Sequence, residues 1–335
     1  MRRAWQALRY SGVGVMLAGV FSSIVGCSTE DLIRALIVFL ALFFTGGSGG
    51  AGGSGDSGGS GGSSGGSAPA ITKVYVLSAS NEKVFRANFD GTGGEDLGKL
   101  SSPVGLDFIA IDAVNRKMYV TETVADRVLR ANLDGTGVED LGNIGGTDAP
   151  RGIALDLTAG KLYVASQDTQ SVFRANLDGT GSENLGNFGG GLSAPNGIAL
   201  DLSTGKMYVA SFGNDKVFRA NLDGTGAEDL GNLGGVDGPL GIALDLTSGK
   251  MYVTSYNENK IYRANLDGTG SEDLGVLAGA NGSYYIALDL SAGKMYVTSS
   301  GNDKVLRANL DGTGVEDLGN FGGVDSPRGV AFGPE

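Results

Sequence analysis

The chain contains no histidine, and its 335 residues include only one cysteine, one tryptophan and seven prolines. Without histidine, the Ser-His-Asp and Cys-His catalytic arrangements are excluded, and so are zinc sites built on imidazole or on paired thiolates. A pH switch based on histidine is excluded as well. This composition is not that of an ordinary cytosolic enzyme.

Positive charge is also scarce, because 25 lysines and arginines stand against 37 acidic residues and give a net charge of −12. No part of the sequence forms the basic stripe that binding to phosphate backbones requires. We therefore predict that nucleic acid is not a partner. Glycine is the abundant residue, with 60 copies, and its distribution divides the chain into parts.

The first 27 residues have the order of a secretory signal. Arg2, Arg3 and Arg9 precede an apolar stretch, Val13 to Val25, and a small residue then precedes Cys27. Residues 24–27 resemble the lipobox of bacterial lipoproteins, which implies that Cys27 is lipidated and becomes the mature N-terminus. The alternative is an uncleaved membrane helix in which the cysteine is incidental.

Residues 28–45 contain a second apolar run, Leu32 to Phe44, which is interrupted only by Arg34. Thirteen residues are too few to cross a bilayer of about 30 Å as a helix. We predict a short segment near the membrane, with a distorted second span as the alternative. Either arrangement places the protein in the cell envelope, exported and anchored at a membrane.

Residues 46–69 form a predicted flexible linker. Between Gly46 and Ser67 there are 13 glycines and 7 serines, so little apolar surface is available to offset the entropy of ordering the segment. Its root-mean-square reach is roughly 25 Å. We expect one folded domain from residue 70 to residue 335.

This domain consists of repeats of 44 or 45 residues. The motif RANxDGTG occurs six times, and its asparagines are Asn88, Asn132, Asn176, Asn221, Asn265 and Asn309. Two further motifs, KxYV and IALD with its variants, also occur six times. Residues alternate with period two within each motif, and Asp-Gly and Gly-Lys turns separate them, which predicts strands joined by hairpins.

Four strands in about 44 residues are typical of one blade of a β-propeller. The sequence therefore predicts an all-β, six-bladed propeller of four-stranded blades. The first repeat begins at its second strand, whereas the chain ends on a lone first strand around Val330. We predict that this C-terminal strand completes the first blade and closes the ring, which removes two exposed sheet edges.

The segment IALDLTAGKLYVASQDTQSVFRANLDGTGSENL resembles the YWTD repeat, or class B repeat, of low-density lipoprotein receptors. The resemblance covers residues 71–335 and includes the period, the number of repeats and the LDG turn. The naming motif differs, since YWTD is replaced by YVAS, YVTS, YVTE or YVLS. The resemblance implies a six-bladed propeller that binds proteins or acts as a spacer.

The repeats differ mainly on one predicted face. The residue two before each IALD-like motif and the residue four after each KxYV tyrosine vary around the ring, whereas the hairpins of the opposite face hardly change. The varied positions include aromatic residues and arginines, which are enriched in binding hot spots. The predicted binding face consists of Arg151, Phe212, Tyr256, Tyr284 and Arg328.

We therefore predict a binding module, not an enzyme, that needs no cofactor and recognises a protein or a glycan. A competing hypothesis is a metal-dependent hydrolase similar to gluconolactonase, because Pro195-Asn196-Gly197 resembles the metal-ligand asparagine motif of that family. Its metal would be held by Asp107, Glu122 and Asn196. Two simpler hypotheses also fit the sequence: the varied face reflects drift at exposed loop positions, or the propeller is a purely structural spacer.

Overall fold

The structure is a computed structural model that describes residues 69–100 and 105–335. The predicted signal (1–27) with Cys27, the apolar segment (28–45) and nearly all of the linker (46–69) lie outside these residues. Within the described ranges, no helix is long and apolar enough to cross a bilayer.

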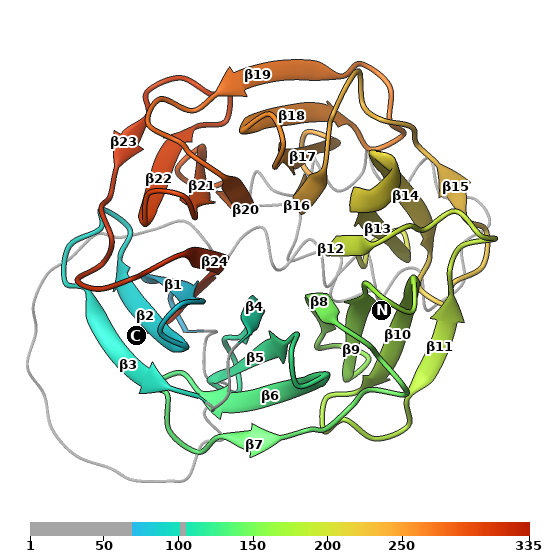
Figure 1. The fold of residues 1–335 in the computed structure, drawn as a ribbon, viewed down its shortest axis with the longest axis horizontal. Coiled ribbons are helices and arrows are strands. Elements are labelled where there is room, and N and C mark those ends of the chain that lie inside the picture. Colours follow the sequence, from blue (N-terminus) through green and yellow to red (C-terminus); the bar gives the residue numbers. More distant parts are fainter. Residues whose placement is uncertain (1–68, 101–104) are drawn as a thin grey trace, which may run out of the picture. The chain divides into compact units, whose positions relative to one another are not determined.

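Six four-stranded antiparallel sheets are arranged in a ring, as Figure 1 shows, and we call the axis of this ring the channel. The predicted six-bladed propeller is confirmed. The innermost strand of each blade carries the IALD-like motif. These inner strands are β4 (Leu106–Asp112), β8 (Pro150–Asp156), β12 (Pro195–Asp201), β16 (Pro239–Asp245), β20 (Ser283–Asp289) and β24 (Pro327–Gly333).

The second strands carry KxYV and are β1 (Lys73–Ser78), β5 (Lys117–Glu122), β9 (Lys161–Ser166), β13 (Lys206–Ser211), β17 (Lys250–Ser255) and β21 (Lys294–Ser299). The third strands carry RAN and are β2 (Lys83–Asn88), β6 (Arg127–Asn132), β10 (Ser171–Asn176), β14 (Lys216–Asn221), β18 (Lys260–Asn265) and β22 (Lys304–Asn309). The outer strands are short: β3 (Glu95–Lys99), β7 (Glu139–Asp140), β11 (Glu183–Gly186), β15 (Glu228–Asp229), β19 (Glu272–Val276) and β23 (Glu316–Asp317). A 3-10 turn, η2 (Phe212–Asn214), follows β13.

The ring closes as the sequence predicts. β24 pairs with β1 in antiparallel register, with Val330 opposite Val76, so the first blade contains both ends of the folded chain. The Tyr75 hydroxyl donates a hydrogen bond to the carbonyl of Pro334 at 2.6 Å. The closure therefore ties the last residues of the chain to the first strand through both ladder and side-chain bonds.

The hydrophobic core lies between neighbouring blades. One cluster joins Tyr163 of the third blade to Met207, Val209 and Phe218 of the fourth, and equivalent clusters recur around the ring. The second strands are buried along nearly their whole length because a neighbouring blade covers each face of the sheet. The outer strands are largely exposed, so burial decreases from the channel outward.

The RAN arginines connect the blades. Arg174 donates to the Glu183 carboxylate on the outer strand of its own blade at 2.6 Å and to the carbonyl of Leu222 in the next blade at 3.0 Å. Equivalent pairs of bonds are made by Arg130, Arg219, Arg263 and Arg307. These arginines thus stabilise the fold from one blade to the next.

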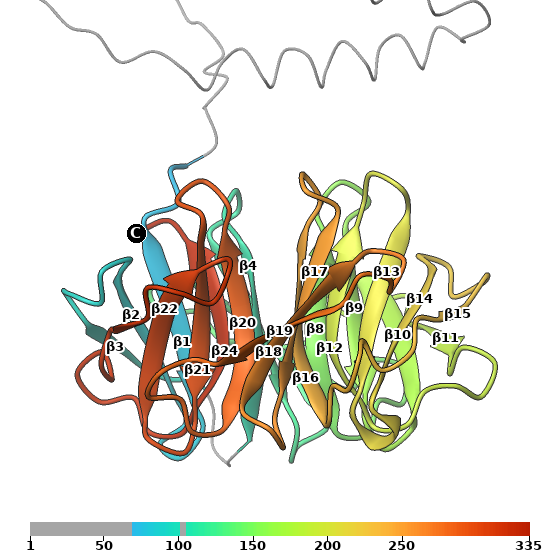
Figure 2. The same cartoon turned by 90° about the horizontal axis from the view of Figure 1, so that it is seen from above.

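The strands run between two faces of the propeller, which Figure 2 shows from the side. At one end, which we call the pocket face, Pro195 at the start of β12 pairs with Ser211 at the end of β13. At the other end, the hairpin face, Asp201 pairs with Lys206. Both chain ends of the propeller lie at the hairpin face, where the Thr72 amide donates to the carbonyl of Gly333.

Candidate functional site

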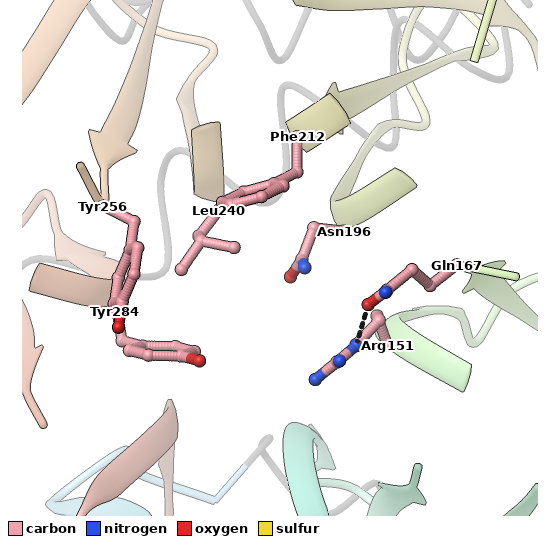
Figure 3. A pocket seen from close by; sticks show the side chains of 7 residues that line it. All are labelled: Arg151, Gln167, Asn196, Phe212, Leu240, Tyr256 and Tyr284. Carbon is pink, nitrogen blue, oxygen red and sulfur yellow. Dashed lines mark hydrogen bonds between the residues drawn. The ribbon is translucent and has the colours of Figure 1, made fainter. Parts of the chain in front are cut away.

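A pocket of about 180 Å³ lies at the mouth of the channel on the pocket face (Figure 3). Inner strands and the segments after second strands supply its lining, because antiparallel pairing brings these two positions to the same end of a blade. The lining residues come from the third to sixth blades and are Arg151, Gln167, Asn196, Phe212, Leu240, Tyr256 and Tyr284. Four of the five predicted binding-face residues are among them.

The fifth, Arg328, does not line the pocket but contacts the lining residue Tyr284. Its guanidinium carbon is 4.0 Å from the centre of the Tyr284 ring, which is a cation–π contact. Tyr256 packs edge-on against Tyr284 with 5.2 Å between ring centres, and Phe212 lies 6.5 Å from Tyr256. The structure therefore brings all five residues of the predicted face into one contiguous cluster.

Two arginines converge on a buried carboxylate beside the pocket. Arg151 donates to Asp107 Oδ2 at 2.7 Å, and Arg328 donates to Asp107 Oδ1 at 3.3 Å. Asp107 is only 2% exposed. Burial tends to lower the pKa of Arg151, but the attraction and hydrogen bond of Asp107, together with the nearby hydroxyls of Tyr285 and Tyr284, outweigh it, so the pKa is raised and Arg151 stays charged.

Tyr285 reaches from β20 to two other blades. Its hydroxyl oxygen is 3.2 Å from Asp107 Oδ1 and 3.1 Å from Asn196 Oδ1. Burial raises its pKa well above the ordinary value, so the hydroxyl keeps its single hydrogen. The hydroxyl donates this hydrogen to both acceptors, Asp107 Oδ1 and Asn196 Oδ1. The NH₂ group of Asn196 makes no hydrogen bond to another described residue.

Sequence reasoning missed Tyr285 and its neighbour Phe108, although a signal for both was present. Four inner strands begin with the pattern Pro-x-Gly, whereas β4 begins Leu-Asp-Phe and β20 begins Ser-Tyr-Tyr. At the glycines there is no room for a side chain, since a Cβ on Gly152 would lie 2.3 Å from the backbone carbonyl oxygen of Asn196. Phe108 and Tyr285 replace glycine and pack against one another, with 3.8 Å between ring centres and a tilt of 54° between the rings.

The proposed metal ligands are only partly brought together. Asp107 and Asn196 both adjoin the Tyr285 hydroxyl. Glu122, which is fully buried, pairs instead with Arg127 at 2.5 Å, and the same arginine pairs with Asp140 on the outer strand. The carboxylate of Glu122 therefore takes part in an ion pair within its own blade, whereas Asp107 pairs with Arg151 and Arg328.

The residues that the structure describes contain no group of three or more acidic or cysteine side chains placed to hold a metal ion. The Asp-Gly turns of the hairpin face bond internally. Asp178 Oδ1 accepts from both the amide and the hydroxyl of Thr180, at 3.0 and 2.6 Å, and the other five turns repeat this pattern. This bonding fits the structural role expected of these turns.

Comparison with known proteins identifies the fold. No family model matches the chain, and no curated protein matches it. Among solved structures, a chain of a nidogen/laminin complex matches with a TM-score of 0.69 and 18% identity, covering 78% of this chain and 98% of that one.

A virginiamycin B lyase from Staphylococcus aureus matches with a TM-score of 0.57 and 16% identity, over 78% of this chain and 90% of the lyase. A catalytically inactive variant of that lyase, with quinupristin, matches with a TM-score of 0.56 and 15% identity over 78% and 91% of the two chains. At these identities the matches define a β-propeller and leave YWTD-repeat membership a resemblance.

Proposed function

We propose that this protein is an exported, membrane-tethered binding module that recognises a protein or a glycan with its pocket face. The observation that carries the proposal is the clustering of the varied residues. Positions that differ among otherwise similar repeats form one pocket that combines arginine, amide and aromatic side chains. Such a combination is typical of binding sites, where a few polar groups fix the orientation of a ligand on an apolar surface.

The place where the chain enters the propeller supports a tether. Residue 72 pairs with Gly333 at the hairpin face, so an anchor upstream of it is attached on the side opposite the pocket. A ligand approaching the pocket face then does not have to displace the attachment point. The nidogen/laminin neighbour is a propeller in a protein complex, which agrees with a binding role for this fold.

The metal-dependent hydrolase receives less support from the geometry. Two arginines already neutralise Asp107, and added positive charge at this point disfavours a divalent cation. The lyase neighbour offers no shared chemistry either, since a histidine-to-alanine variant of that enzyme is described as catalytically inactive and this chain has no histidine.

An affinity capture tests the binding role. The full chain, solubilised in mild detergent and immobilised, is incubated with envelope extract beside a variant with Arg151→Ala, Phe212→Ala and Tyr256→Ala. A matched control carries alanine at three exposed leucines of the hairpin face, Leu202, Leu246 and Leu290. We expect the pocket variant to lose at least about 90% of a ligand that the wild type and the control retain, because truncated hot-spot residues each cost about 1–2 kcal/mol or more. Equal retention of a ligand by all three proteins, or no ligand on any of them, would contradict binding through the pocket face.

Fractionation of the same cells tests the tether. The wild type should sediment with membranes, and Cys27→Ser should move to the soluble fraction if the lipid is the anchor. A Cys27→Ser variant that stays with membranes would assign the anchor to an apolar segment, either an uncleaved helix within residues 13–25 or residues 28–45, and not to the lipid. Recovery of both proteins in the soluble fraction contradicts the tether.

A further inference from the structure

The pocket presents hydrogen-bond donors on one side. Gln167 uses its carbonyl oxygen to accept from Arg151 Nε at 2.6 Å, so the orientation of its amide is fixed. The NH₂ group of Gln167 and the Nη2 amino group of Arg151 make no hydrogen bond to other described residues. These donors therefore remain available to an acceptor in the pocket, as Figure 3 shows from close by.

The charge around the pocket favours an anion. Arg151 and Arg328 contribute two positive charges, and Asp107 contributes one negative charge. Arg151, Arg328 and Asp107 together carry one net positive charge, which lies beside the free donors. Because charge-assisted hydrogen bonds are about twice as strong as neutral ones, a carboxylate is the acceptor that these groups bind best.

The opposite side of the pocket is lined by aromatic rings, which are tilted relative to one another. Arg328 covers one face of the Tyr284 ring, and Tyr284 also lines the pocket, so we expect a ligand to contact the other face of this ring. Tyr256, which is 38% exposed, and the partly buried Phe212 extend this surface toward solvent. The electron-rich faces of such rings attract the weakly positive C–H groups of a saturated ring.

One more donor completes the lining. The Asn196 side-chain oxygen accepts from the Tyr285 hydroxyl, whereas the NH₂ group makes no hydrogen bond to another described residue, and the residue is only 5% exposed. An NH₂ group in this position requires an acceptor from a ligand, such as a hydroxyl oxygen.

On the basis of the proposed binding function, we infer that the pocket holds one acidic sugar unit, a pyranose ring that carries a carboxylate. The carboxylate accepts from Arg151 and Gln167, the C–H face of the ring packs on Tyr284, and a ring hydroxyl accepts from the Asn196 NH₂ group. An acidic peptide side chain supplies the carboxylate but neither the saturated ring nor the hydroxyl. A neutral sugar supplies the ring and hydroxyls but no charge for the arginine cluster.

Binding of matched monosaccharides to the full chain tests the inference. Glucuronic and galacturonic acid are titrated by ligand-observed NMR beside their neutral parents, glucose and galactose, and beside N-acetylglutamate amide as a peptide probe. We expect at least one of the acids to bind about tenfold or more tightly than its neutral parent, because the carboxylate is the group that the charged donors select. Equal binding of acid and neutral sugar, or tighter binding of the peptide probe, would overturn the inference.

A nearly isosteric variant locates the site. Gln167→Glu keeps the oxygen that accepts from Arg151 Nε and replaces the free NH₂ by a second negative oxygen, so the fold is expected to persist. We expect loss of acid-sugar binding in this variant and unchanged binding in Leu202→Ala on the hairpin face. Unchanged binding in Gln167→Glu would contradict the assigned site. If no sugar binds while the capture experiment still depends on the pocket residues, this inference fails and the binding function stands.

Discussion

At the scale of single residues, Tyr285 holds the channel mouth together. One side chain from the sixth blade contacts Asp107 of the second blade and Asn196 of the fourth, and its ring packs against Phe108. The hydroxyl is the shared partner of two groups that are themselves buried. Since buried polar groups are costly to leave unpaired, the geometry of the pocket depends on this hydroxyl.

Removing only the hydroxyl measures that dependence. We expect Tyr285→Phe to lower the free energy of unfolding by about 1–3 kcal/mol, because Asp107 and Asn196 each lose a partner in a buried site. The measurement is urea denaturation followed by circular dichroism. Tyr256→Phe is the matched control, since the Tyr256 hydroxyl makes no hydrogen bond to other described residues, and its change should stay within about 0.5 kcal/mol. Equal effects of the two substitutions would show that the hydroxyl is not important for stability.

At the scale of elements, the inner strands determine how closely the blades approach. Four of the six carry glycine at the third position, where the neighbouring inner strand passes too near for a side chain. The other two carry Phe108 and Tyr285, whose rings pack against each other at a tilt of 54°. These two large residues belong to the blades on either side of the first blade, and glycine occupies the other four positions.

Adding one methyl group tests this close approach. Gly152→Ala would place a Cβ 2.3 Å from the backbone carbonyl oxygen of Asn196, so β8 and β12 must move apart. We expect a loss of about 3 kcal/mol, the upper end of what overpacking usually costs. Gly142→Ala is the control, because it has a positive φ of 74° but no atom within 4 Å, and its cost should be about 1–2 kcal/mol. Thermal unfolding of the two variants measures these losses of stability. A smaller loss for Gly152→Ala than for Gly142→Ala would contradict the steric explanation.

At the scale of the whole molecule, electrostatics are dominated by repeated ion pairs and an acidic balance. Residues 1–70 contain four arginines and three acids, so the propeller carries a net charge of −13. Each RAN arginine of the second to sixth blades binds a glutamate of the outer strand. The hydrogen bond from the arginine holds the pKa of Glu139, Glu228, Glu272 and Glu316 below its usual value.

These shifts predict how stability depends on pH. A carboxylate with a lowered pKa in the folded state stabilises the fold above its unfolded pKa of about 4.3, and this contribution is lost as the pH falls below that value. Burial raises the pKa of Tyr119, Tyr163 and Tyr208, so their contribution is present below about pH 10 and is lost as the pH rises through the folded values.

With no histidine to titrate in between, we expect a nearly constant melting temperature from about pH 5 to pH 9 and a fall on either side. Circular dichroism melts from pH 3 to pH 11 measure this profile. A step near pH 6–7 would contradict it.

Much of the fold was predictable because the same pattern of strands and turns recurs in each repeat. RAN, KxYV and IALD recur at a period that allows four strands, and the missing first strand of the first blade is matched by the extra strand at the end, β24. The clustering of Arg151, Phe212 and Tyr256 could also be predicted, since equivalent positions of different blades lie on the same face by symmetry.

The interior of the channel mouth was not predictable in the same way. The break of the Pro-x-Gly pattern at Phe108 and Tyr285 can be read in the sequence, but its meaning depends on which blades adjoin across the channel. The role of Asp107 likewise follows from two arginines, Arg151 and Arg328, that are 44 and 221 residues away in the chain.

The sequence by itself therefore determined the number of blades, the order of strands, the closure and the face that varies, because each depends on period and on local hairpins. Only the tertiary structure decided which side chains meet at the channel. Closing the ring brings inner strands of distant repeats together at one end, and their contacts depend on side-chain size and hydrogen bonding across the channel. Neither property has a period along the chain, so the pairing of Asp107 with its arginines and the reach of Tyr285 appear only in three dimensions.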